Sequence, residues 1–153
     1  MPNELEELML RQAPHAAAAE QYVLGAILYY PKCVAEVAGS LRPDDFYVQK
    51  NREIYETIYT MFSYSRTIDP VTVLENLKQN GYDADDQAWP YLLQLMRNAS
   101  TAANVGLYIQ IIKDKTLLRQ LLETSQELVN MVQEGTETGQ TLLDAAEQRI
   151  YAI

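Results

Sequence analysis

The sequence predicts an all-α protein in which a compact head of several helices is followed by a long antiparallel helical hairpin. Apolar residues recur at helical spacing in one segment after another, and no segment alternates like a half-buried strand. Glycine and proline, six of each, fall mainly between these segments. After residue 100 the apolar pattern continues for over thirty residues, and Gly106 near its start is the one breaker. These observations place the head at 1–100 and the hairpin at 101–153.

The composition is that of a folded protein. Of the 153 residues, 48% are hydrophobic and 22% are charged, which excludes a disordered or collagen-like chain. The single cysteine, Cys33, cannot form an intramolecular disulfide, so we expect a reducing, cytoplasmic setting. No apolar run approaches the roughly 20 residues that cross a bilayer, and the acidic N-terminus is unlike a signal peptide. No membrane partner is therefore expected.

The charge argues against direct nucleic-acid binding. The net charge is −9, from 21 acids and 12 bases, and the acidic excess is present both before and after residue 100. A protein that binds nucleic acid unaided normally gathers Lys and Arg on one face, because its affinity comes largely from neutralising phosphates. Any role near DNA should therefore depend on protein partners or on another part of a larger protein.

The head is predicted to begin with a short helix over 4–12 and a second over 16–30 that stops at Pro31. Gly25 interrupts the apolar face of the second helix. A glycine inside a helix costs about 1 kcal/mol relative to alanine, so it usually marks the close approach of another backbone. Tight packing within the head is the expected reason for Gly25.

Two further helices and a turn follow. A short helix is predicted over 32–39, and a turn over 40–47 places Pro43 at a favoured first helical position. The next helix, over 51–64, has one apolar face, with tyrosines flanking it. The face comprises Ile54, Ile58, Met61 and Phe62, and the flanking residues are Tyr55 and Tyr59.

The last two helices of the head are marked by their ends. Asp69 before Pro70 is typical of a helix N-terminus, and Gly81 is a typical terminator. Another helix is expected over 86–98, with Pro90 near its start, where a proline is tolerated.

The hairpin is predicted from one long helix and its return. The long helix covers 101–134, which at 1.5 Å per residue is about 50 Å. A five-residue turn over 135–139 makes the next helix an antiparallel neighbour, with Thr141 and Asp144 as its expected capping pair.

The apolar stripe of the long helix is too broad for one neighbour, so self-association through the hairpin is expected. The alternative is that the arm folds back over the head. The predicted subunit-interface residues are Ile109, Ile112, Leu118 and Leu121 on the long helix, and Leu143, Ala146 and Ile150 on the return helix.

The sequence contains little that points to catalysis. It has no GxxxxGK[ST] loop to hold a nucleotide phosphate, and its one histidine, His15, stands at a predicted helix start. The carboxylate clusters at 44–45 and 83–86 fall in turns that open helices, where acids suit the helix dipole. A small acid/base enzyme built on them would need a pocket of perturbed carboxylates, which nothing in the sequence indicates. We predict no catalytic residue, no metal ligand and no cofactor in this chain.

Seven motifs in register resemble the N-terminal domain of DnaB-type replicative DNA helicases, and together they cover nearly the whole chain. One departure precedes Tyr91, where the family commonly has a glycine-containing turn and this chain reads DDQAWP. The motifs are AEQYVLGAILYYP at 19–31, DDFY at 44–47, NREIYETI at 51–58, IDPVTVLENL at 68–77, YLLQL at 91–95, STAANVGLYIQIIKDKTLLRQLL at 100–122 and LLDAAEQRIYAI at 142–153.

The resemblance implies the N-terminal tier of a hexameric ring, in which hairpins pair two subunits and primase docks. It places primase-facing positions near Tyr91, Leu122 and Leu128, and a helicase loader is a further implied partner. The motor domain, with ATP, Mg and most contact with DNA, would lie beyond Ile153 and is absent from this chain. The alternative is a free-standing helical adaptor or loader-like replication protein. A reading frame that continues past Ile153 into a GxxxxGK[ST] segment would exclude that alternative.

Overall fold

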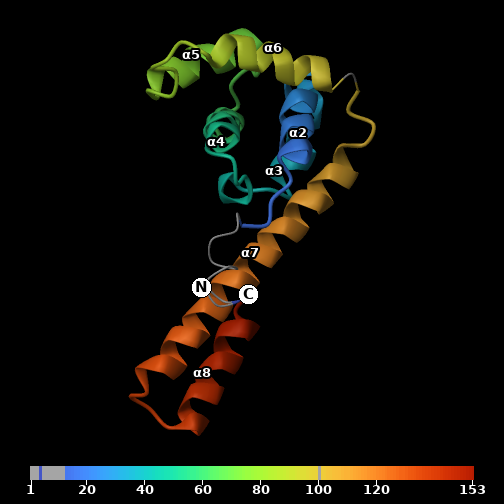
Figure 1. Ribbon diagram of the computed structural model, residues 1–153. Helices are drawn as coiled ribbons and strands as arrows, with labels where there is room; N and C mark the ends of the chain where they lie inside the picture. Colours follow the sequence, from blue (N-terminus) through green and yellow to red (C-terminus); the bar gives the residue numbers. More distant parts are fainter. Residues whose placement is uncertain (1–3, 5–12, 100) are drawn as a thin grey trace. The chain divides into compact units, whose positions relative to one another are not determined.

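The computed structural model describes residue 4, residues 13–99 and residues 101–153. These residues form α-helices and 3₁₀ turns with no strand among them, so the all-α prediction is confirmed. The predicted helix over 4–12 lies outside the described residues except for its first position. In chain order the elements are α2 (Ala17–Tyr29), η1 (Pro31–Cys33), α3 (Val34–Ala38), η2 (Pro43–Asp45), α4 (Gln49–Ser63), α5 (Pro70–Gln79), α6 (Ala88–Asn98), α7 (Val105–Glu134) and α8 (Gly139–Tyr151) (Figure 1).

The chain divides into two compact units. One comprises residues 16–113, which we call the head, and includes the first turns of α7. The other comprises residues 114–153, which we call the hairpin, together with the N-terminal segment up to His15. The predicted domain boundary after residue 100 stays a prediction. In the hairpin α7 and α8 run antiparallel, and Arg149 of α8 forms an ion pair with Glu127 of α7 (Figure 1).

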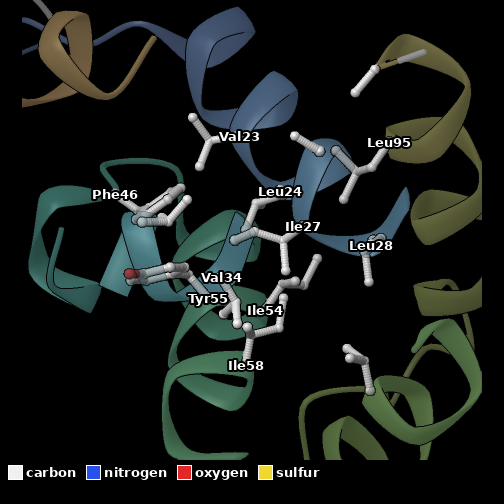
Figure 2. Packing of buried hydrophobic residues seen from close by; sticks show 14 of the residues in the cluster. Val23, Leu24, Ile27, Leu28, Val34, Phe46, Ile54, Tyr55, Ile58 and Leu95 are labelled. Atoms are coloured by element: carbon white, nitrogen blue, oxygen red, sulfur yellow. The ribbon is translucent and has the colours of Figure 1, made fainter. Parts of the chain in front are cut away.

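The core of the head is assembled around α2. Its residues Val23, Leu24, Ile27 and Leu28 are almost fully buried and meet side chains from the surrounding helices (Figure 2). Burying one such side chain contributes about 1.5–3 kcal/mol relative to leaving it in water. The neighbours labelled in the same view are Val34, Phe46, Ile54, Tyr55, Ile58 and Leu95.

Gly25 lies where α2 and α6 pack closely, as predicted. A Cβ built on Gly25 would stand 2.1 Å from the carbonyl oxygen of Leu95 and 2.8 Å from Cβ of Ala99. Both groups belong to α6 or to its C-terminal cap, so no side-chain rotation could make room. Only glycine allows this helix crossing.

The predicted face of α4 needs a correction. Tyr55, expected at its edge, is fully buried, whereas Phe62, expected on the face, is 38% exposed. The Tyr55 ring stacks on Phe46 with centroids 4.5 Å apart, and its hydroxyl donates to the carbonyl of Leu41 at 2.8 Å. Because the polar tip of Tyr55 has a buried acceptor, the whole side chain can enter the core. Burial also raises the pKa of Tyr55.

The helix termini confirm one predicted cap and correct two others. Asp69 accepts a hydrogen bond from the backbone N–H of Thr72 at 2.8 Å, and Pro70 occupies the first turn of α5. At α8 the cap is Thr138, whose hydroxyl accepts from the N–H of Thr141 at 3.3 Å, so Thr141 is not the capping residue. Helix α7 begins at Val105 rather than at residue 101.

A candidate protein-interaction surface on the hairpin

The hairpin has no core of its own. Among its residues, 114–153, none is buried, although apolar side chains occur along both helices. Two antiparallel helices can cover each other on one side only, and the opposite sides remain open to water. Exposed apolar surface of this extent on one element is typical of a site for protein association.

The base patch is the first part of this exposed surface and comprises Leu117, Leu118 and Leu121. These side chains are 45%, 38% and 41% exposed. The ion pair between Arg149 and Glu127 sets the level at which α8 lies beside α7, and α8 ends two residues later. At 1.5 Å per residue α8 therefore ends before it reaches the base patch. Nothing in α8 covers these leucines.

The tip groove is the second part and lies between α7 and α8 near their connecting turn. It encloses a volume of about 400 Å³, and every side chain that lines it is apolar. Val132 and Leu143 are 65% and 53% exposed, so the groove is open to solvent. Its lining residues are Leu128, Met131 and Val132 from α7 and Gly139, Leu142, Leu143 and Ala146 from α8.

Two of the predicted subunit-interface residues are not available for that role. Ile109 and Ile112 are 2% and 1% exposed because the first turns of α7 pack into the core of the head. The apolar stripe of α7 is continuous in sequence, but its first third is already covered within one chain. We therefore remove these two positions from the predicted interface.

The other predicted interface residues divide between the two surfaces. Leu118 and Leu121 belong to the base patch, whereas Leu143 and Ala146 line the tip groove. Ile150 is 52% exposed and follows Arg149 directly. A role of these five residues in subunit pairing stays a prediction.

The three predicted primase-docking residues lie in different environments. Leu128 lines the tip groove beside Leu143 and Ala146, which were predicted for subunit pairing, and Leu122 is half-buried on α7. Tyr91 belongs to α6 in the head and is half-buried, and burial is the main cause that raises its pKa. Docking at these positions also stays a prediction.

Tyr91 is part of a polar network inside the head. Its hydroxyl donates to the side-chain oxygen of Asn51, and the Lys50 ammonium lies 4.1 Å from the centre of its ring. Asn51 in turn donates to the carboxylate of Glu20 at 3.0 Å. The network fixes α6 against α4 and α2, which gives Tyr91 a structural role whether or not it also contacts a partner.

Glu20 is the centre of this network, and the sequence analysis missed it. The residue is 1% exposed, and its carboxylate accepts hydrogen bonds from the N–H groups of Tyr47 and Val48 at 2.9 and 3.3 Å. These groups stand at the start of α4, where an anion is favoured by the helix dipole. An acid next to the apolar face of α2 was the available signal, but it also fits an ordinary solvated helix start.

The described residues outside this network give no catalytic constellation. No group of His, Cys, Asp and Glu among them could hold a metal ion. The acidic turns serve local structure: Asp45 accepts from the N–H of Arg42 at 2.7 Å, and Asp83 accepts from the N–H of Ala88 at 2.9 Å. None of the helices formed by these residues is long and apolar enough to span a bilayer.

Comparison with known sequences finds one family. The family whose model matches residues 12–114 is described as the DnaB-like helicase N terminal domain. The replicative DNA helicase DnaB of Mycobacterium leprae is 34% identical over 145 residues, which are 94% of this chain and 24% of that protein. The protein of the same name from Pasteurella multocida is 30% identical over 142 residues, or 92% of this chain and 30% of that protein. The chain thus spans between a quarter and a third of the length of these curated relatives.

Comparison with solved structures agrees. The crystal structure of the N-terminal domain of DnaB helicase from Mycobacterium tuberculosis matches with a TM-score of 0.84 and 34% identity, over 93% of this chain and all of that one. A DnaB-like replicative helicase, described together with its interactions with primase, matches with a TM-score of 0.72 and 20% identity over 88% of this chain and 31% of that one. At that identity the second match shows a shared fold only.

Proposed function

Because the chain belongs to the DnaB-like helicase N-terminal domain family, we propose that it is the assembly and docking module of a hexameric replicative DNA helicase. The observation that carries this proposal is the hairpin, whose described residues include apolar side chains on both helices and no buried one. An element of this kind reaches its full stability only when another chain covers it.

The chemistry of unwinding is assigned to the rest of the protein. ATP, Mg and the main contacts with DNA would belong to a motor domain, because this chain offers neither a phosphate-binding loop nor a basic face for them. The place of action is the cytoplasm, where replication of a bacterial chromosome occurs. This chain would contribute subunit pairing and the docking of primase.

Subunit pairing is tested by measuring the mass of the chain in solution. We expect light scattering to give dimers or larger assemblies that dissociate on dilution. The variant Leu118→Asp/Leu121→Asp should shift the mass toward the monomer with unchanged helical content by circular dichroism, because both side chains are exposed within one chain. A wild-type chain that stays monomeric at the highest accessible concentration would contradict the pairing.

Primase docking is tested with the C-terminal domain of primase. We expect this domain to bind the wild-type chain in isothermal titration calorimetry, as the printed description of the second structural relative indicates for that helicase. A helical adaptor of another kind has no reason to bind it. Absence of any heat of binding would remove primase from the proposed function.

A further inference from the structure

The tip groove and the base patch have opposite electrostatic surroundings. Residues 120–153 carry six acids and one base, a net charge of −5, and that base, Arg149, is already paired with Glu127. Residues 114–122 carry two bases and one acid. Both surfaces are apolar at their centre, so charge is what distinguishes them.

The lining of the tip groove determines the class of its ligand. A site for a small molecule normally has a few convergent polar groups that fix the ligand's orientation, and no polar side chain lines this groove. An open apolar trough between two helices suits the apolar face of a third helix, whose side chains at i, i+3, i+4 and i+7 would enter it. Met131 adds a flexible side chain that adapts to different shapes.

The rim determines the charge of that helix. Four acids stand next to lining residues in sequence: Glu127, Glu134, Asp144 and Glu147. A second copy of this tip would bring the same negative charge against them, and like charges across an interface are unfavourable. Lys and Arg beside the apolar stripe of an incoming helix would instead be attracted.

We propose that the tip groove binds an amphipathic helix with basic flanks, supplied by a protein partner, while a second copy of the chain pairs at the base patch. This proposal rests on the proposed function, because it divides docking and assembly between two parts of the same hairpin. It assigns Leu128, Leu143 and Ala146 to the partner. Leu118, Leu121 and Ile150 are left for subunit pairing.

The test uses two designed helical peptides with one and the same apolar stripe, flanked by lysine in one and by glutamate in the other. Binding to the full chain is measured by fluorescence anisotropy. We expect the lysine-flanked peptide to bind at least about tenfold more tightly. Its affinity should fall as NaCl is raised from about 50 mM to about 500 mM. Equal affinities, or no binding of either peptide, would overturn the proposal.

Paired variants separate the groove from the base patch. Val132→Asp/Leu143→Asp alters two exposed groove residues, and we expect it to weaken the lysine-flanked peptide at least about tenfold without changing the mass of the assembly. Leu118→Asp/Leu121→Asp should do the reverse, lowering the mass while the peptide still binds. If the groove variant also dissociates the assembly, a second copy occupies the groove and the proposal is wrong, although the proposed function survives.

The rim is tested by charge reversal. Glu134→Lys/Glu147→Lys changes the charge beside the groove but none of its apolar lining. We expect the preference between the two peptides to shrink by roughly tenfold, because the glutamate-flanked peptide gains what the lysine-flanked one loses. An unchanged preference would show that the acidic rim does not select the ligand.

Discussion

The head and the hairpin are both built from amphipathic helices, yet they bury their apolar side chains in different ways. Every buried apolar residue among those described lies between Ala19 and Ile112, and residues 114–153 contribute none. The head therefore contains a packed core of the kind that stabilises a small domain. The hairpin presents a similar type of side chain to solvent.

This contrast shows which part of the molecule is built for stability and which for association. A substitution in the head should act through packing and buried hydrogen bonds and should change the free energy of unfolding. A substitution in the hairpin should leave that free energy almost unchanged and act on partners. Helix α7 carries both behaviours, because its first turns enter the core and its later turns do not.

The largest effect in the head is expected at Gly25. Gly25→Ala places a methyl group 2.1 Å from the carbonyl oxygen of Leu95, so α2 and α6 must move apart. We expect the free energy of unfolding to fall by about 3 kcal/mol, measured by urea denaturation followed by circular dichroism. The matched control is Gly139→Ala in the hairpin, where the added Cβ meets nothing within 4 Å. That variant should be unchanged, and an equal loss there would end the contrast.

The next effect concerns the buried carboxylate of the head. Glu20→Ala leaves the N–H groups of Tyr47 and Val48 and the amide of Asn51 without their acceptor. Buried donors without a partner are costly, and we expect a loss of about 2–3 kcal/mol in the same measurement. Glu123→Ala on the hairpin removes an exposed acid and should be neutral. A neutral Glu20→Ala would mean that water replaces the carboxylate.

These two positions also mark the limits of sequence analysis. The glycine was recognised because its cost inside a helix has few explanations, and Asp69 before Pro70 was recognised because both choices are local. Glu20 acts through groups that lie 27 to 31 residues away, and no local pattern shows such contacts.

The errors of the sequence analysis have the same origin. Periodicity defines an apolar stripe but not what covers it, so the buried Ile112 and the exposed Leu118 were predicted for the same surface. The edges of a stripe are equally ambiguous, as the exchange between Tyr55 and Phe62 shows. Within the candidate surface, the exposed leucines follow from the sequence, but the groove needs both helices in place.

A smaller effect compares one tyrosine from each region. Tyr55→Phe removes the hydroxyl that donates to the carbonyl of Leu41 and leaves that acceptor buried. We expect the free energy of unfolding to fall by about 1 kcal/mol. Tyr151→Phe in the hairpin is the control, because Tyr151 is 93% exposed and should not affect stability. If both variants were neutral, the phenol of Tyr55 would contribute through its ring alone.

The smallest effect is expected in the turn before α6, where this chain has no glycine. Asp86 adopts φ of 58°, a left-handed conformation that disfavours most side chains and that glycine enters without strain. Asp86→Gly should raise the free energy of unfolding by up to about 1 kcal/mol, since the gain is partly offset by the greater freedom of glycine in the unfolded chain. Asp86→Ala should lower it, because alanine tolerates this conformation less well than aspartate. The two variants are therefore expected to change the thermal midpoint in opposite directions, and a shift of both in the same direction would mean that the Asp86 side chain, rather than its backbone, determines the stability of this turn.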